Sequence, residues 1–255
     1  MAPRRPFLIL TLVAIMVTVL ACTQPGAPAP ATSQPPASEP APKTKGACSN
    51  PLYPVIIGAE WTYATSGIST GTFKHSITDV RADGFTDRDV FSGGVTRTGE
   101  WKCEAGTLTA LSPAESLSAM IQTEGMTSEF KTTSSSGVTL PAIVRPNDSW
   151  SQNFTIEGTQ TLSGQDVQGK GDMSYSCTAA DTETVAVPAG SFDAVRVGCQ
   201  LNGTITVAMA GFEVPTEFTS AATIWYARDV GMVKTENEIS DIGHSTIELT
   251  SYTIP

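Results

Sequence analysis

From residue 48 to the end of the chain, short runs of alternating apolar and polar residues are separated by Gly, Asn, Asp and Pro. In one run Trp61 and Tyr63 alternate with smaller or polar neighbours, and in the next run Phe73, His75 and Ile77 do the same. Because successive side chains of a strand point to opposite faces, this alternation predicts half-buried antiparallel strands. It restricts the chain to a mainly β fold.

The same pattern recurs along this whole region and predicts roughly a dozen strands. The proline and glycine of Val187-Pro188-Ala189-Gly190 predict a chain reversal, and the runs on either side are long enough to bend across a curled sheet. A second turn is predicted at Arg228-Asp229-Val230-Gly231. We therefore expect a single antiparallel sheet curled into a half-barrel. Its further strands are predicted at residues 85–91, 95–103, 107–111, 129–133, 150–157, 173–187, 192–209, 217–227, 232–239 and 245–252.

A helix is predicted between two of these strands. Ser112-Pro113-Ala114-Glu115 is a capping box with proline at the first helical position, and Leu117, Met120 and Ile121 follow on one face. The pattern predicts about three turns that stop near Gly125. A helix this short is marginal alone, so we expect it to pack against the sheet.

Residues 1–21 have the layout of a signal peptide, because Arg4 and Arg5 precede an uncharged apolar run over residues 7–21. The run is shorter than the roughly 20 residues of a membrane-spanning helix, which disfavours a retained anchor helix. Its end, Val19-Leu20-Ala21-Cys22, resembles the lipobox of bacterial lipoproteins. The resemblance implies that Cys22 is acylated and becomes the new amino terminus. Ordinary secretion after cleavage nearby is the alternative.

Residues 22–47 comprise Cys22 and a segment rich in Pro, Ala, Ser and Thr that lacks large apolar side chains. Such a segment cannot bury enough surface to fold, and its prolines favour an extended chain. We expect a signal peptide at residues 1–21, a lipidated and disordered tether at 22–47, and a β half-barrel domain at 48–255. The membrane is then a partner through the lipid, and the domain is extracytoplasmic, at the cell surface or facing the periplasm.

Four cysteines remain once Cys22 is assigned to the lipid. An even number in an exported chain favours two disulfides over free thiols, and four cysteines allow three connectivities. We favour Cys48 with Cys103, which ties the start of the domain to an early strand. We favour Cys177 with Cys199 because this pair flanks one predicted hairpin. Reduced, buried cysteines are the alternative.

The charge balance disfavours several classes of partner and chemistry. The chain has 25 acidic and 15 basic side chains, whereas nucleic-acid binding depends on clustered Lys and Arg. It has two histidines, His75 and His244, and no C-x-x-C motif, so zinc ligands and histidine bases are scarce. We expect no nucleic-acid partner, no metal, no cofactor and no catalytic residue.

Two motifs lie in contexts that disfavour a functional interpretation. Gly67-Ile68-Ser69-Thr70-Gly71 matches the G-x-S-x-G of hydrolases, but it lies between two predicted strands and no helix follows it. We interpret it as a hairpin loop, and a hydrolase remains a remote third hypothesis. Asp83, Asp87 and Asp89 lack the spacing of an EF-hand loop, so we interpret them as solvated strand charge rather than calcium ligands.

Four sequence blocks spread over the domain carry a resemblance to a known family. They are Asn50-Pro51-Leu52-Tyr53-Pro54-Val55 with Gly58, Trp61 and Tyr63; Trp101 and Cys103 with Gly106-Thr107-Leu108; Val187-Pro188-Ala189-Gly190-Ser191-Phe192-Asp193-Ala194; and Trp225-Tyr226-Ala227-Arg228-Asp229-Val230-Gly231-Met232-Val233-Lys234. These blocks resemble the TapB-like group of exported proteins, which is related in architecture to the lipoprotein carriers LolA and LolB. The resemblance implies an antiparallel half-barrel with helix against its open side, and no established catalytic constellation.

These observations lead to one main hypothesis, a lipid-anchored, extracytoplasmic and non-enzymatic protein. Its concave sheet would bind a hydrophobic ligand or an apolar segment of a partner protein. Trp61, Trp101, Trp150 and Trp225 are the candidates for lining that surface, with ordinary core packing as the alternative. The alternative function is an envelope structural or interaction protein that uses its outer surface or a sheet edge.

Overall fold

The computed structural model describes residues 46–120, 126–162, 164–209, 212–240 and 243–255. The expected signal peptide, the expected lipidation site at Cys22 and nearly all of the expected tether lie outside the described residues. Within the described residues, no helix has the length and apolar character needed to cross a membrane.

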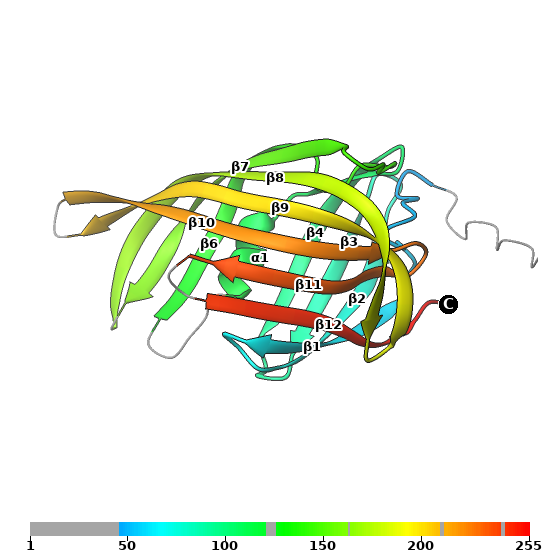
Figure 1. Cartoon of the computed structure of the whole chain (residues 1–255). Coiled ribbons are helices and arrows are strands. Elements are labelled where there is room, and N and C mark those ends of the chain that lie inside the picture. Colours follow the sequence, from blue (N-terminus) through cyan, green and yellow to red (C-terminus); the bar gives the residue numbers. More distant parts are fainter. Residues whose placement is uncertain (1–45, 121–125, 163, 210–211, 241–242) are drawn as a thin grey trace, which may run out of the picture. The chain divides into compact units, whose positions relative to one another are not determined.

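One antiparallel sheet dominates the folded unit (Figure 1). The described elements are β1 (Glu60–Gly67), β2 (Gly71–Val80), β3 (Gly84–Phe91), β4 (Thr96–Glu104), β5 (Thr107–Ala110), α1 (Pro113–Met120), β6 (Met126–Gly137), β7 (Ser149–Leu162), β8 (Gln165–Val187), β9 (Gly190–Met209), β10 (Phe212–Ala227), β11 (Gly231–Ile239) and β12 (Gly243–Thr253). The spatial order is β5-β4-β3-β2-β1-β12-β11-β10-β9-β8-β7-β6. The predicted mainly β fold, with one antiparallel sheet and one short helix, is confirmed.

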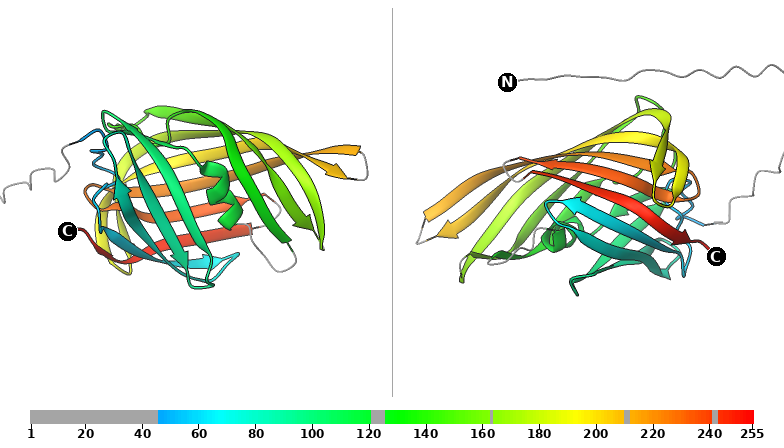
Figure 2. Two further views of the ribbon diagram at one scale, coloured as in Figure 1. Left: turned by 180° about the vertical axis from the view of Figure 1, so that it is seen from behind. Right: turned by 60° about the horizontal axis from the view of Figure 1, so that its bottom comes forward.

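The sheet curls further than the expected half-barrel and is nearly closed. Its two edge strands approach each other where Leu108 of β5 forms an isolated bridge with Leu140, which follows β6. Helix α1 contacts both β4 and β6 (Figure 2). The Glu115 carboxylate accepts a hydrogen bond from the Thr132 hydroxyl at 3.0 Å, and the Phe130 amide donates to Ser118 at 3.0 Å. The helix therefore packs on the free edge of β6.

The helix begins at Pro113, where the capping box places it. Its described part ends at Met120, and residues 121–125, where the predicted stop near Gly125 falls, lie outside the described residues.

Both predicted turns are present. The reversal at Pro188 joins β8 to β9, which are 23 and 20 residues long, and Gly190 has φ of 139°. The turn from β10 to β11 places Asp229 at φ 59° and Gly231 at φ 103°, backbone angles that asparagine, aspartate and glycine adopt most readily. Register shifts in the β1–β12, β10–β11 and β8–β9 pairings mark β-bulges in β12, β11 and β8, which bend these strands and help the sheet to curl.

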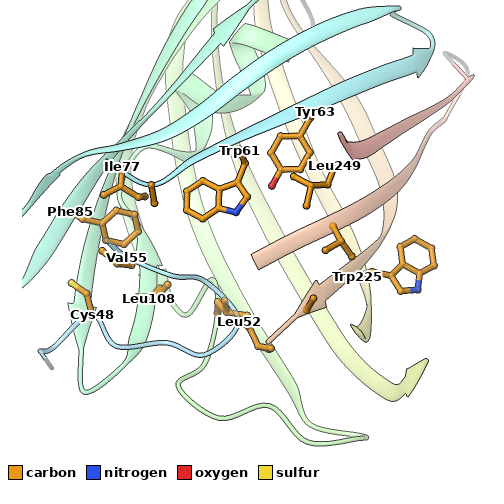
Figure 3. Close-up of a cluster of buried hydrophobic side chains, with 14 of the residues drawn as sticks. Cys48, Leu52, Val55, Trp61, Tyr63, Ile77, Phe85, Leu108, Trp225 and Leu249 are labelled. Carbon is orange, nitrogen blue, oxygen red and sulfur yellow. The ribbon is translucent and has the colours of Figure 1, made fainter. Parts of the chain in front are cut away.

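The largest hydrophobic cluster lies where residues 46–59 meet the sheet (Figure 3). Trp61, Tyr63, Phe85, Leu108 and Leu249 are among its buried members. The structure contains the two disulfides that the sequence favoured, one between Cys48 and Cys103 and one between Cys177 and Cys199. The first joins residues 46–59 to β4, and the second joins directly paired positions of β8 and β9.

Candidate functional site

A closing segment, residues 46–59, holds one end of the curled sheet together. Asn50 is buried, and its side-chain amide donates hydrogen bonds to the carbonyls of Gly106 at 2.8 Å and Pro141 at 2.9 Å. The carbonyl of Pro51 accepts a hydrogen bond from the amide of Asp229, in the turn between β10 and β11, at 2.7 Å. The segment therefore bridges strands from opposite parts of the sheet, and it brings Tyr53 into the interior.

A cavity of about 530 Å³ lies inside the sheet next to this segment. Its walls are formed by alternate residues of β1 to β4 on one side and of β10 to β12 on the other, because successive side chains of a strand point to opposite faces of the sheet. Aromatic and aliphatic side chains make up much of this wall: Trp61, Tyr63, Phe73, Phe91, Trp101, Ile224, Tyr226, Met232, Ile239 and Ile247. The interior is therefore not filled by the protein's own side chains.

Two of the four tryptophans proposed as ligand-lining residues, Trp61 and Trp101, lie on the cavity wall. Trp61 is fixed by a hydrogen bond from its indole nitrogen to the carbonyl of Val230 at 2.6 Å. Trp101 is stacked on Phe85 with ring centroids 5.3 Å apart. Because both rings are held by other contacts, they present rigid surfaces to the cavity.

For Trp150 and Trp225 the expectation is wrong, because neither lines the cavity. Trp225 points to the opposite face of β10 from its neighbours Ile224 and Tyr226, where its indole donates to Glu183 at 2.6 Å and Lys234 lies over its ring. Trp150 donates to the carbonyl of Thr139 at 2.9 Å and packs in the core beside the Cys177–Cys199 disulfide. Both are core residues, which is the alternative that the sequence left open.

Four charged side chains, His75, Asp87, Asp89 and Arg97, gather at one end of the cavity and form what we call the charged quartet. Nδ1 of His75 lies 2.6 Å from Asp89, and Arg97 lies 2.7 Å from the other oxygen of Asp89. Arg97 also lies 3.5 Å from Asp87. The second oxygen of Asp87 accepts hydrogen bonds from the indole of Trp101 at 2.8 Å and from the hydroxyl of Tyr53 at 3.0 Å.

The interpretation of Asp87 and Asp89 as solvated charge is therefore wrong, since they are 0% and 6% exposed. Asp83 is exposed in the turn before β3, as expected. Along β3, Asp87 and Asp89 alternate with outward-facing residues in the same way as the core residue Phe85 and the wall residue Phe91. Their side chains therefore lie on the inward face of the strand. In the described residues, no group of three or more His, Cys, Asp and Glu side chains is arranged to hold a metal ion.

Both ring nitrogens of His75 have a partner in the site. Nε2 lies 2.9 Å from the hydroxyl oxygen of Tyr53, and Nδ1 lies 2.6 Å from Asp89. Tyr53 in turn donates its hydroxyl proton to Asp87. Each carboxylate of the quartet also contacts Arg97, so its members are paired with one another.

Burial and neighbouring charges shift the pKa values of Asp89, Arg97 and Tyr53. Burial raises the pKa of Asp89, but the hydrogen bond from His75 and the charge of Arg97 outweigh burial and lower that pKa below its ordinary value. Burial lowers the pKa of Arg97, but the charges of Asp89 and Asp87 raise it above its ordinary value. Burial beside Asp87 raises the pKa of Tyr53 well above its ordinary value, so the phenol keeps its proton.

Ser69 lies in the hairpin loop between β1 and β2, as predicted for the G-x-S-x-G motif, and it is exposed at the cavity. The histidine that also lines the cavity, His75, lies further along β2, and its two ring nitrogens bond to Tyr53 and Asp89. The described geometry therefore does not bring Ser69 and His75 together as a nucleophile and base.

Asp87 can occupy its position because the facing residue of β4 is Gly99. A Cβ atom at Gly99 would collide with Oδ1 of Asp87 and come within 3.3 Å of the Trp101 indole nitrogen. We expect Gly99→Ala to lower the free energy of unfolding by about 1–3 kcal/mol, because the carboxylate must move away from its hydrogen-bond donors. Chemical denaturation measures this, with Gly198→Ala as the matched control because nothing lies within 4 Å of its added Cβ. Equal losses in the two variants would contradict the close packing of Asp87 on Gly99.

A 12-stranded antiparallel sheet curled around an aromatic-lined cavity defines a barrel-like β protein with an internal space. The chain belongs to the DUF3108-like family, whose model matches residues 97–240. No curated protein matches the chain.

Three solved structures are similar to the chain. A protein of Bacteroides fragilis, described as exported and as having a YmcC-like fold, shares 15% identity at a TM-score of 0.49, over 79% of this chain and 98% of its own. A protein of Parabacteroides distasonis, described as a lipoprotein, shares 16% at a TM-score of 0.49, over 80% and 99%. The hypothetical lipoprotein YmcC of Escherichia coli shares 8% at a TM-score of 0.35, over 78% and 86%.

Proposed function

We propose that this protein is a lipid-anchored, extracytoplasmic and non-enzymatic protein that binds a hydrophobic ligand, or an apolar segment of a partner, inside its curled sheet. The cavity carries the proposal: its volume of about 530 Å³ lies within the roughly 300–1,000 Å³ of ligand pockets. Removing apolar ligand surface from water against the aromatic wall supplies the binding free energy. The proposal extends the resemblance to the TapB-like group and to the carriers LolA and LolB.

The extracytoplasmic location is supported by two independent features. The amino-terminal sequence resembles a lipoprotein signal ending at Cys22. The folded unit contains two disulfides, which persist in oxidising compartments outside the cytoplasm. Together they favour a domain tethered to the outer side of a membrane.

A second candidate function is an envelope interaction protein that uses its outer surface. One observation favours it: β10 extends beyond the part that pairs with β11, and Phe212 and Val214 on this extension are 75% and 43% exposed. Pro215 also lies there, where β10 has a partner on one side only. Contiguous exposed apolar patches mark contact sites for partner proteins, and these two side chains lie two residues apart on the same extension.

A variant that fills the cavity separates these two functions. Ile247 lies on the wall in the middle of β12, paired with Thr65 and Thr235. We expect the uncharged fluorophore N-phenyl-1-naphthylamine to bind the wild-type domain, and Ile247→Trp to weaken this binding about tenfold or more, which corresponds to roughly 1.4 kcal/mol. Fluorescence titration measures both.

The matched control for this titration is Phe212→Ser, which removes an exposed aromatic ring outside the cavity wall. It should leave fluorophore binding unchanged. Wild-type protein that does not bind the fluorophore, or equal weakening in the two variants, would overturn ligand binding in the cavity.

A further inference from the structure

The charged side chains on the cavity wall are paired with one another. Among the described residues that line the cavity, the ionisable side chains of His, Asp and Arg are those of the quartet. Both carboxylates of the quartet contact the Arg97 guanidinium, and Asp89 also contacts His75. A charged ligand group would therefore find no unpaired counter-ion on this wall.

The quartet also has little freedom to reorganise around a ligand ion. The side chains of His75, Asp89 and Arg97 are 12%, 8% and 17% exposed, and that of Asp87 is 1% exposed. Separating one member from its partner leaves an uncompensated charge in a low-dielectric interior, which is strongly unfavourable. An ion in the cavity would have to break such a pair or lose its water without compensation.

The rest of the wall offers uncharged polar groups in addition to its apolar surface. Hydroxyl and amide side chains line the region around the β1–β2 and β3–β4 loops and the facing parts of β11 and β12: Ser69, Thr70, Thr72, Ser92, Asn237 and Ser245. Asn237 donates to Ser245 at 3.3 Å, a long hydrogen bond. Groups of this kind can exchange hydrogen bonds with a hydroxyl, ester or amide of a ligand without requiring a charge.

We infer that the ligand of this cavity has no net charge and is an uncharged lipid-like molecule whose polar part is a hydroxyl, ester or amide group. This inference rests on the proposed function. The charges of the quartet are already paired with one another, which disfavours anions and cations alike, and the uncharged polar groups elsewhere on the wall accept a neutral head group.

Three amphiphiles with the same alkyl chain length test the inference on the wild-type domain: monolauroylglycerol, laurate and dodecyltrimethylammonium. Each is titrated below its micelle concentration at neutral pH against bound N-phenyl-1-naphthylamine. We expect monolauroylglycerol to displace the fluorophore at a concentration about tenfold lower than either ion. Displacement by laurate or by the ammonium ion at an equal or lower concentration overturns the inference while leaving the proposed function intact. Failure of the fluorophore itself to bind overturns the proposed function instead.

A variant tests whether the quartet selects the ligand. If the quartet were purely structural, the variant would not change the relative displacement of the fluorophore by charged and uncharged amphiphiles. Asp89→Asn removes one negative charge from the quartet, so the displacement ratio between laurate and monolauroylglycerol should shift about tenfold in favour of laurate. Asp79→Asn, on the exposed surface, should leave the ratio unchanged. An unchanged ratio in folded Asp89→Asn protein overturns the role of the quartet in selecting the ligand. The wild-type comparison needs no variant, so it decides the inference even where Asp89→Asn does not fold.

Discussion

Replacing Asp89 by Asn is expected to lower the free energy of unfolding by about 3–5 kcal/mol at neutral pH, the usual cost of breaking a buried ion pair. The variant leaves Arg97 with one carboxylate partner, Asp87, and it removes the carboxylate that His75 and Arg97 contact at 2.6 and 2.7 Å. Denaturation in urea, with the midpoint and slope compared to wild type, measures the loss.

The same variant has a defined pH dependence. Burial raises the pKa of Asp89, while the His75 hydrogen bond and the Arg97 charge lower it, and its net position is below the ordinary value of 3.8. A carboxylate with a lowered pKa in the folded state contributes stability that is fully present above the unfolded pKa and is lost as the pH falls through the folded pKa. The stability that the ionised Asp89 contributes should therefore be lost only as the pH falls below about 3.8, where the difference between wild type and Asp89→Asn narrows.

An exposed ion pair of the same length provides the control. Asp79 lies 2.7 Å from Arg81, as Asp89 does from Arg97, but both members of the Asp79 pair are more than 40% exposed. Exposed pairs contribute about 0–1 kcal/mol because water and salt screen them. Asp79→Asn should leave the free energy of unfolding close to that of wild type. If Asp89→Asn costs no more than Asp79→Asn, the quartet does not stabilise the fold.

The strands and turns were predictable because their causes are local. Alternation around Trp61 and Phe73 sets which side chains face inward, and Pro188 with Gly190 sets a reversal. The disulfide pairing followed from the same local logic, since Cys177 and Cys199 flank one hairpin. The closure of the sheet was not predictable in this way, because it depends on Leu108 meeting Leu140 across the two edges.

The quartet was missed although a local pattern for it exists. Asp87 and Asp89 have the parity of Phe85 and Phe91, Arg97 has the parity of Trp101, and His75 has the parity of Phe73, so each charged residue falls on an apolar face. That pattern indicates burial. It does not indicate which charges meet, because this depends on the register that pairs His75 with Asp89 and Asp89 with Arg97 across three strands. Tyr53 comes from outside the sheet, and no strand pattern predicts its position.

Removing the Cys48–Cys103 disulfide is expected to have the other large effect. The bond spans 55 residues and the Cys177–Cys199 bond spans 22, for which loop-closure entropy predicts losses of about 4 and about 3 kcal/mol in stability. The test compares the double variant Cys48→Ala with Cys103→Ala against Cys177→Ala with Cys199→Ala by urea denaturation. The second pair is the matched control, because it joins positions that β8 and β9 already pair directly.

Removal of the two disulfides should have more different effects on ligand binding than on stability. Cys48 anchors the closing segment that carries Tyr53 to the quartet and Pro54 to the cavity wall, whereas neither Cys177 nor Cys199 lines the cavity. Without the first disulfide, the segment keeps the two hydrogen bonds of Asn50 and the one that Ala47 accepts from Gly106, but it is no longer covalently joined to β4. N-phenyl-1-naphthylamine binding should therefore weaken about tenfold in the first double variant and remain close to wild type in the second, measured where both are folded. Equal binding in the two variants would show that residues 46–59 close the end of the sheet without shaping the cavity.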